Sequence, residues 1–228
     1  HQLVSVITQP ARPRGRGRKK IPTDIGLWAI ENDLNCIETD NINSDQMLKT
    51  IEDFKADILV VIAFGQYVST KVIAKFKHGA INVHGSLLPK YRGAAPVNWA
   101  IINGEKQSGI SIITLAKKMD AGQVLNTAKI RVEPSDTAGS LHDKLALLSA
   151  PVLLDTLRQI ETGTAVYTDQ DEDKVTFAPK FEKSDGIIDF SKTASDVVNL
   201  IRGLWPWPGA QARLQTPQTQ KTHTLNIA

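Results

Sequence analysis

Two polar side chains lie at the carboxyl end of a predicted apolar strand, the place where an α/β sheet collects its chemistry. Asn82 and His84 are two positions apart in the segment Ala80–His84, so on a strand their side chains share one face. An amide and an imidazole inside an apolar sheet are costly unless they are hydrogen-bonded or used. An amide can donate to an oxygen that gains negative charge, and an imidazole can transfer a proton. The pair is a candidate catalytic site, although a hydrogen-bonded core histidine also explains His84.

Asp120 is the candidate for a third member of this site. It lies in the turn Met119–Gly122, between two predicted strands. If neighbouring strands bring this turn beside His84, the carboxylate, the imidazole and the amide form an acid–base and oxyanion site. Periodicity does not establish that contact. An aspartate that only forms the turn stays an open alternative.

The elements that must position these residues alternate between strands and helices. The apolar pattern predicts strands over Leu3–Thr8, Asn35–Glu38, Asp57–Gly65, Ala80–His84, Gly109–Leu115 and Val124–Val132. It predicts helices over Asp24–Asn32, Ser44–Phe54 with Ser44 as N-cap, Ser69–Phe76 and Pro96–Ile102, and from Thr137 or Ser140 to Ile160. The run over 57–65 is apolar throughout, which is typical of a central strand covered on both faces. The alternation predicts an α/β fold with a Rossmann-like, doubly wound, mostly parallel sheet.

The chain is predicted to contain two domains joined by a linker. Residues 1–163 hold the α/β pattern, and the charged, weakly periodic residues 164–183 are predicted to be the linker. Residues 184–228 are predicted to begin a small β-domain, with a helix over Ala194–Leu204 and strands near Ala210–Leu214 and Thr222–Ile227. The chain looks cut at both ends, because the sheet lacks a convincing first strand and the β-domain is too short to close a core.

Composition excludes several classes of protein. The 228 residues are 41% hydrophobic and 22% charged, with a net charge of +3, as in an ordinary globular protein. No apolar stretch is long enough to span a bilayer, and no signal-peptide pattern is present, so we expect a cytoplasmic protein without a membrane. The single cysteine, Cys36, excludes an internal disulfide and is expected to be a small buried hydrophobe. The five histidines show no ligand spacing, so no metal is expected. A monomer is the simplest expectation.

A basic cluster near the start of the chain breaks this even composition. Its cations, interleaved with two glycines and a proline, are Arg12, Arg14, Arg16, Arg18, Lys19 and Lys20. Such a run repels itself and cannot be buried, so we predict a solvated, mobile loop. The loop could bind an anion such as a phosphate backbone. A loop that only adds solubility is the alternative.

Four segments resemble those of a known family. Asn82–Pro96, with the sequence NVHGSLLPKYRGAAP, resembles the signature segment of the folate-dependent formyltransferases, and Asp120–Gly122 resembles their Asp-x-Gly loop. Thr8–Lys20 is similar to the basic insertion of the methionyl-tRNA formyltransferases, which reaches the acceptor stem of the tRNA. Trp205–Ala210 resembles the entry to their carboxyl-terminal β-barrel domain.

The resemblance implies a fold and a reaction. The fold would be the formyltransferase fold, followed by the start of a small, OB-like β-barrel. The reaction would be transfer of the formyl group of 10-formyltetrahydrofolate to the α-amine of methionine on initiator tRNA, through a tetrahedral oxyanion. Asn82 would donate to that oxygen, His84 would manage the proton or add stabilisation, and Asp120 would orient His84. The amine is already a nucleophile, so no covalent intermediate is expected.

The resemblance also implies binding residues. The segment of Ser86, Leu87, Leu88 and Pro89 resembles the family's folate-contacting turn, and Phe64 and Gly65 would line the pterin pocket beside it. The implied tRNA-binding residues are Arg14, Arg16, Arg18, Lys19 and Lys20. Arg16, which matches the central arginine of the family's Gly-Arg-Gly, would contact the tRNA end, and the cluster would add salt-dependent affinity rather than base recognition.

Four other functions remain as alternatives. A formyltransferase acting on an amino-sugar nucleotide, or a domain that passes the formyl group to water, should lack the basic insertion. A purine-pathway formyltransferase would have no β-barrel domain, and a non-catalytic RNA-binding protein would leave Asn82, His84 and Asp120 without a purpose. One residue departs from the family pattern: Gln123 stands where many relatives carry an acidic residue.

Overall fold

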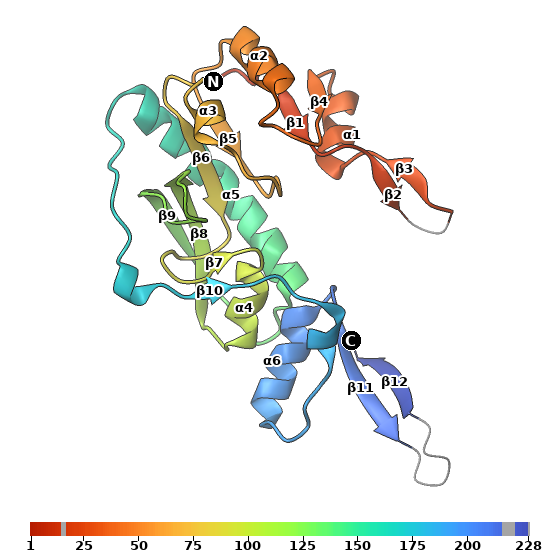
Figure 1. The fold of residues 1–228 in the computed structure, drawn as a ribbon. Helices are drawn as coiled ribbons and strands as arrows, with labels where there is room; N and C mark the ends of the chain where they lie inside the picture. The colour runs from red at the N-terminus through yellow and green to blue at the C-terminus, as the bar shows by residue number, and fades with distance from the viewer. Residues whose placement is uncertain (15–16, 216–221, 228) are drawn as a thin grey trace. The chain divides into compact units, whose positions relative to one another are not determined.

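A computed structural model describes residues 1–14, 17–215 and 222–227. The chain forms two compact units, His1–Asn82 and Val83–Ala228, and Figure 1 follows both from red to blue. This division differs from the predicted domain boundaries at 163 and 184, which remain a prediction. Each unit is described by itself.

The first unit is built on two pairs of parallel strands. β1 (Val6–Thr8) pairs with β4 (Cys36–Glu38), and β5 (Leu59–Val61) pairs with residues 80–82 of β6 (Ala80–His84). Three helices belong to this unit: α1 (Asp24–Glu31), α2 (Asp45–Phe54) and α3 (Thr70–Ile73). Parallel pairs separated by helices are what the alternating pattern predicts.

Local hydrogen bonds explain where these helices begin. The hydroxyl of Ser44 accepts from the Met47 N–H at 3.3 Å, so Ser44 is the N-cap predicted for α2. Thr23 caps α1 in the same way through the Gly26 N–H. The prediction of α2 is confirmed at both ends, because cap and apolar spacing are both local features.

The strand predicted over Asp57–Gly65 is wrong in its length. Only Leu59–Val61 form β5, and these three residues are half-buried rather than covered on both faces. The ladder ends where Ala63 adopts a φ of 46°, a left-handed conformation that a strand does not tolerate. Ile62 beside it is 56% exposed. Backbone conformation therefore ends this strand earlier than the apolar run suggests.

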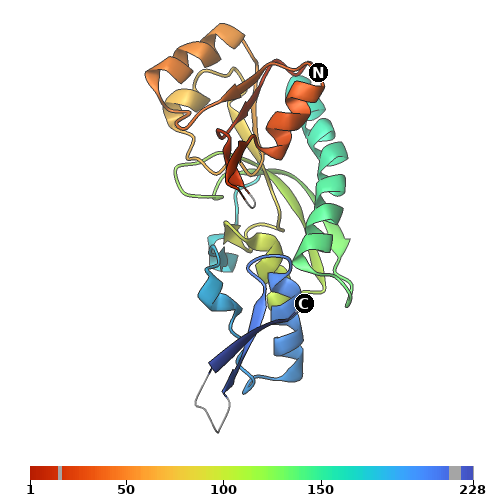
Figure 2. The same ribbon diagram turned by 90° about the vertical axis from the view of Figure 1, so that its right-hand side faces the viewer.

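The basic cluster, predicted to be a solvated, mobile loop, contains two short paired strands. β2 (Arg12–Arg14) pairs antiparallel with β3 (Lys19–Ile21), and the register sets Arg14 opposite Lys19. The hairpin extends away from β1 and α1 in both views (Figures 1 and 2). Antiparallel pairing lets the backbone groups hydrogen-bond to each other while the charged side chains stay in solvent. Charge repulsion among the side chains therefore does not prevent strand pairing.

The second unit is centred on two long antiparallel strands. β8 (Gln107–Thr114) pairs with β9 (Val124–Arg131), and both pack against the long helix α5 (Ala138–Glu161), as Figures 1 and 2 show. Ile110, Ile112 and Ile113 of β8 are almost fully buried. The antiparallel pairing makes the fold a mixed one, whereas its strand and helix positions match the predicted ones within about three residues.

Smaller elements complete this unit. They are β7 (Arg92–Gly93), α4 (Pro96–Ile102), the 3₁₀ helices η1 (Glu172–Lys174) and η2 (Lys183–Gly186), β10 (Phe177–Ala178), α6 (Ala194–Leu204), β11 (Ala210–Gln215) and β12 (Thr222–Ile227). β10 pairs in parallel with β7, and β11 pairs antiparallel with β12. Residues 164–183, predicted to be a linker, therefore include η1 and a strand that is hydrogen-bonded to β7.

A buried carboxylate anchors the start of α5. Asp136, whose side chain is 4% exposed, accepts from the Glu133 N–H at 2.8 Å, the Ser140 hydroxyl at 2.9 Å and the Lys144 ammonium at 2.7 Å. Burial by itself would raise the pKa of Asp136, but the hydrogen bonds from Lys144, Glu133 and Ser140 outweigh it and lower the pKa below its ordinary value of 3.8.

This depressed pKa predicts how stability depends on pH. The stabilisation from Asp136 is complete above the unfolded-state pKa near 3.8 and is lost as pH falls through the lower folded-state pKa. Asp136→Asn should therefore cost about 1–3 kcal/mol at pH 6, and this difference from the wild type should shrink below about pH 3.8. Urea unfolding at both pH values measures it, with the exposed Asp143→Asn as control. A difference that stays constant with pH would contradict the assignment.

Candidate active site

Strand β6 carries the two polar residues Asn82 and His84. Ala80 and Ile81 at its start are 4% and 1% exposed, and His84 at its end is 5% exposed. Because side chains alternate along a strand, Asn82 and His84 lie on one face. The strand therefore delivers an imidazole from an apolar interior to the start of the following loop, as predicted.

The imidazole of His84 lies between two oxygen acceptors. Its Nε2 is 2.9 Å from the carbonyl oxygen of Tyr91, and its Nδ1 is 3.6 Å from Oδ2 of Asp120. A carbonyl oxygen only accepts, so Nε2 carries a proton and donates it to Tyr91. Nδ1, which faces the carboxylate, is the nitrogen at which the ring can gain or lose a proton. The contact between His84 and Asp120, which periodicity did not establish, is present.

Asp120 is held by its backbone and by its side chain. Its φ is 52°, an unusual value for a residue other than glycine and one that is common at functional sites. Its Oδ2 accepts from the Gly93 N–H at 2.9 Å. The turn continues through Gly122, where an added Cβ would lie 1.7 Å from the carbonyl oxygen of Thr114 at the end of β8. Asp120 thus forms a turn and also faces His84, so the two alternatives hold together.

Tyr91, which the sequence analysis did not single out, supplies the other contact to His84. Its φ of 65° turns the carbonyl away from an extended path, and its N–H donates to Thr176 Oγ1 at 2.9 Å. Its hydroxyl donates to Glu105 at 2.9 Å and accepts from Asn103 at 3.1 Å. Burial raises the pKa of Tyr91, so this hydroxyl stays protonated. A left-handed tyrosine has no sequence signal that could have revealed it.

The turn predicted to contact folate is held by hydrogen bonds within itself and to Ser111 of β8. Ser86 is 1% exposed, its hydroxyl donates to the Lys90 carbonyl at 2.6 Å, and its carbonyl accepts from the Ser111 hydroxyl at 2.8 Å. Ser111 also accepts from the Leu88 N–H at 3.1 Å. Ser86 therefore fixes the shape of the turn, and Leu87 follows it half-buried.

Leu88 and Pro89 line a hollow in the second unit. It measures about 500 Å³, and its walls combine this turn with the first residues of β9 and the segment 168–171. Its polar lining includes Asp169, Asp171 and Lys174. A hollow of this size with mixed walls lies within the range of about 300–1,000 Å³ that small-molecule sites occupy.

Phe64 and Gly65, the predicted pterin-lining residues, belong to the first unit. The Phe64 carbonyl accepts from the Gln9 side-chain amide at 2.7 Å. Gly65 has a φ of 77°, and a Cβ added there would lie 2.6 Å from Gln9 Nε2, so this position favours glycine. Their role in binding a cofactor remains a prediction.

The predicted tRNA-binding cations occupy the hairpin of β2 and β3 and its connection. Arg18, Lys19 and Lys20 are exposed. Arg14 is the last residue of β2. Arg16 lies outside the described residues. The hairpin thus presents at least three cations to solvent, as binding to a phosphate backbone would require.

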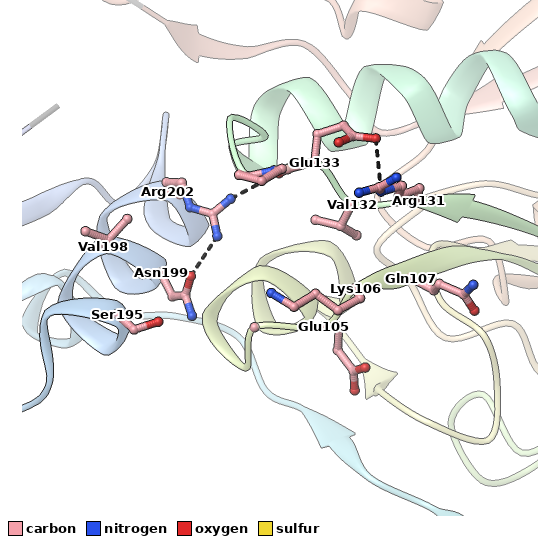
Figure 3. Close-up of a pocket in the computed structure, with 12 residues that line it drawn as sticks. Glu105, Lys106, Gln107, Arg131, Val132, Glu133, Ser195, Val198, Asn199 and Arg202 are labelled. Atoms are coloured by element: carbon pink, nitrogen blue, oxygen red, sulfur yellow. Dashed lines mark hydrogen bonds and ion pairs between the residues drawn. The ribbon is translucent and has the colours of Figure 1, made fainter.

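A second hollow, of about 600 Å³, contains none of the predicted site residues (Figure 3). Arg202 of α6 donates there to the carbonyl oxygens of Glu133 at 3.3 Å and Asp136 at 2.9 Å, and to Asn199 Oδ1 at 2.6 Å. Figure 3 shows its guanidinium directed at Glu133 and Asn199. These contacts tie α6 to the turn before α5, so Arg202 has a structural role.

Two further findings concern ions and membranes. Within residues 1–14, 17–215 and 222–227, no group of three histidine, cysteine or acidic side chains is placed to hold a metal ion. In this described part of the chain, no helix has the length and apolar character that crossing a bilayer requires.

Cys36 is half-buried in β4, where burial and then the charge of Glu38 raise the pKa of its thiol, so it stays protonated.

Comparison with solved structures places the fold. A sugar N-formyltransferase from Shewanella superposes with a TM-score of 0.69 at 19% identity, over 88% of this chain and 79% of that one. HypX from Aquifex aeolicus, solved in complex with tetrahydrofolic acid, superposes with a TM-score of 0.67 at 20% identity, over 82% of this chain and 33% of that one. At these identities the likeness shows a shared formyltransferase fold.

Comparison with protein sequences is more specific. The family model for formyl transferase matches residues 1–157, and the model for the formyl transferase C-terminal domain matches residues 180–223. Methionyl-tRNA formyltransferase of Acetivibrio thermocellus is 43% identical over 92% of this chain and 68% of its own length. That of Geobacter metallireducens is 37% identical over 99% of this chain and 72% of its own length. The chain belongs to the formyl transferase family and, within it, to the methionyl-tRNA formyltransferases.

Proposed function

We propose that Asn82, His84 and Asp120 form the site at which this chain transfers a formyl group from 10-formyltetrahydrofolate to the α-amine of methionyl initiator tRNA. The observation that carries the proposal is the buried imidazole of His84, held between the Tyr91 carbonyl at 2.9 Å and the Asp120 carboxylate at 3.6 Å. A histidine that served only the core would not need a carboxylate held beside its second nitrogen.

The chemistry divides among the three side chains. The folate donor, when bound, supplies a formyl carbon that an amine can attack. Asn82, on the same face of β6 as His84, donates its amide hydrogens to the oxygen that gains negative charge. His84 keeps Nε2 on Tyr91 and exchanges a proton at Nδ1, beside Asp120. Asp120 fixes the orientation of the ring and balances the charge of its protonated form.

The hollow beside Leu88 and Pro89 is assigned to the folate donor, because these two residues belong to the turn expected to contact folate. It offers apolar surface from these residues and from Val124, together with polar lining residues. Phe64 and Gly65 are proposed to add to the pterin pocket, and Ser86 and Leu87 to hold its turn in shape. Transfer to a tRNA-bound amine is a cytoplasmic task, and all the proposed groups come from one chain, so we propose a cytoplasmic monomer.

A test of the acceptor separates this proposal from its alternatives. The intact protein is supplied with 10-formyltetrahydrofolate and, in parallel, with methionyl initiator tRNA, an amino-sugar nucleotide, or water alone. Formylation of the charged tRNA at a rate at least about tenfold above the other two reactions is expected. Formylation of the sugar, or release of formate without transfer to the tRNA, would exclude the proposed acceptor.

The hairpin of β2 and β3 is proposed to contact the tRNA backbone through Arg14, Arg16, Arg18, Lys19 and Lys20. Lys19→Glu with Lys20→Glu should weaken use of tRNA by about tenfold or more at low salt, and should reduce the slope of log affinity against log salt by about 2, while folate binding is unchanged.

The matched control changes the same charge elsewhere in the first unit. Lys49→Glu with Lys71→Glu alters exposed lysines of α2 and α3, and tRNA use should then fall much less. Steady-state kinetics at several salt concentrations measures both double variants. An equal loss in the two, or a parallel loss of folate binding, would argue against a role of the hairpin in tRNA binding.

A further inference from the structure

Gln170 lies in the segment predicted to be a linker, yet its side chain contacts the turn of Asp120. Its Nε2 donates to the carbonyl oxygen of Asp120 at 2.8 Å and to that of Gly122 at 2.7 Å. The two hydrogens of the amide are therefore both used on this one turn, which lies 50 residues away along the chain.

The other end of the same amide binds a buried arginine. Oε1 of Gln170 accepts from Arg92 Nε at 3.0 Å and from Arg92 Nη2 at 2.8 Å. Arg92 is 4% exposed, and Glu172 accepts from its Nη2 at 2.7 Å. The hydrogen bond from Arg92 lowers the pKa of Glu172, which therefore stays ionised. A guanidinium only donates and a carbonyl only accepts, so the orientation of the amide is fixed.

Arg92 stands between two residues that contact the catalytic pair. The residue before it, Tyr91, accepts from His84, and the residue after it, Gly93, donates to Oδ2 of Asp120. Gln170 thus links two parts of the site. Through Arg92 it is bonded to the segment 91–93, which contacts His84 and the Asp120 carboxylate. Through its amide hydrogens it is bonded to the turn that carries Asp120. The separation of 3.6 Å between Nδ1 and Oδ2 is slightly longer than a hydrogen bond. A small shift of the turn therefore decides whether this hydrogen bond forms.

We infer that Gln170 is a positioning residue for formyl transfer, which sets the distance between Asp120 and His84 by bridging Arg92 to the Asp120–Gly122 turn. The inference rests on the proposed function of that pair. A glutamine is specifically suited to this place, because it combines two donors for the carbonyl oxygens with one acceptor for the guanidinium. Glutamate has the same shape and lacks both donors.

The test compares Gln170→Glu with Gln159→Glu in the intact protein. Gln170→Glu can still accept from Arg92 but repels the Asp120 and Gly122 carbonyl oxygens. Gln159, whose amide donates to Asp155 Oδ2 on α5, provides a matched change outside the site. We expect kcat to fall about 100-fold in Gln170→Glu, as a displaced catalytic group would cause, with KM for the tRNA changed less than about threefold. We also expect its pH–rate profile to be displaced, and Gln159→Glu to match the wild type.

A second measurement does not depend on activity. The imidazole nitrogen resonances of His84, followed by NMR, should move in Gln170→Glu and stay in place in Gln159→Glu, in folded protein with unchanged melting behaviour. Unmoved resonances with wild-type kinetics would overturn the inference. Moved resonances in a protein that does not formylate methionyl-tRNA would instead overturn the proposed function and leave the positioning role standing. A kcat loss explained wholly by unfolding, with the His84 resonances of the folded fraction unmoved, would also overturn the inference.

Discussion

His84→Ala in the intact protein is expected to reduce kcat for formylation of methionyl-tRNA by about 10²- to 10⁴-fold, the usual contribution of a positioned acid–base group. The ring is 5% exposed and donates to the Tyr91 carbonyl, while its other nitrogen faces Asp120. Alanine removes the imidazole that contacts both of these acceptors. Steady-state kinetics with 10-formyltetrahydrofolate and charged tRNA measures the loss.

The control for this variant is His142→Ala, because His142 is exposed on α5, where it pairs with its exposed neighbour Asp143. Circular dichroism and thermal unfolding separate lost chemistry from lost folding. Removing a buried hydrogen-bonding group typically costs about 1–3 kcal/mol of stability, which leaves a folded protein at assay temperature if its stability is ordinary. Transfer that continues at more than about a tenth of the wild-type rate would rule out the assigned role of His84.

Gly122→Ala is expected to destabilise the protein by about 1–3 kcal/mol or more and to reduce kcat about 100-fold in the fraction that stays folded. An ideal Cβ on Gly122 would lie 1.7 Å from the carbonyl oxygen and 2.6 Å from the carbonyl carbon of Thr114. Both atoms belong to the backbone of β8, which cannot rotate away as a side chain could. The turn that carries Asp120 must therefore move away from its place beside His84.

Gly163→Ala is the comparison for this prediction. A Cβ there meets nothing within 4 Å, and its φ of 70° leaves a cost of only about 1–2 kcal/mol for the left-handed backbone. Urea unfolding and kinetics on both variants measure the two effects separately. If Gly122→Ala kept wild-type kcat, the position of the Asp120 turn would not limit the reaction.

The sequence predicted the local parts of this fold well, because local signals decide them. Ser44 caps α2 and Thr137 caps α5. In both cases the hydroxyl of the residue just before the helix accepts a hydrogen bond from a backbone N–H of the first turn. Apolar spacing located α6 at Ala194–Leu204 without error. Where the backbone departs from the common conformations, the pattern was misleading, as at Ala63, which ends β5 early.

The candidate site was predictable in its members and not in its geometry. Asn82 and His84 are related by strand periodicity alone, so their shared face followed from the sequence. Their relation to Asp120 depended on a family resemblance, because a turn distant along the chain has no periodic relation to a strand. Gln170 was missed because it lies in a polar segment without periodicity, and only its two-sided hydrogen bonding distinguishes it.

The sequence by itself determined which chemistry is available: an amide and an imidazole at the end of one strand, an aspartate in a turn, and a basic cluster near the start of the chain. Tertiary structure decided how these groups are held. The left-handed backbones of Tyr91 and Asp120 aim a carbonyl and a carboxylate at His84, and Gln170 and Arg92 fix both from a distant segment. The physical reason is that hydrogen bonds between residues far apart in the chain form only when the fold brings them together, and no local pattern encodes them.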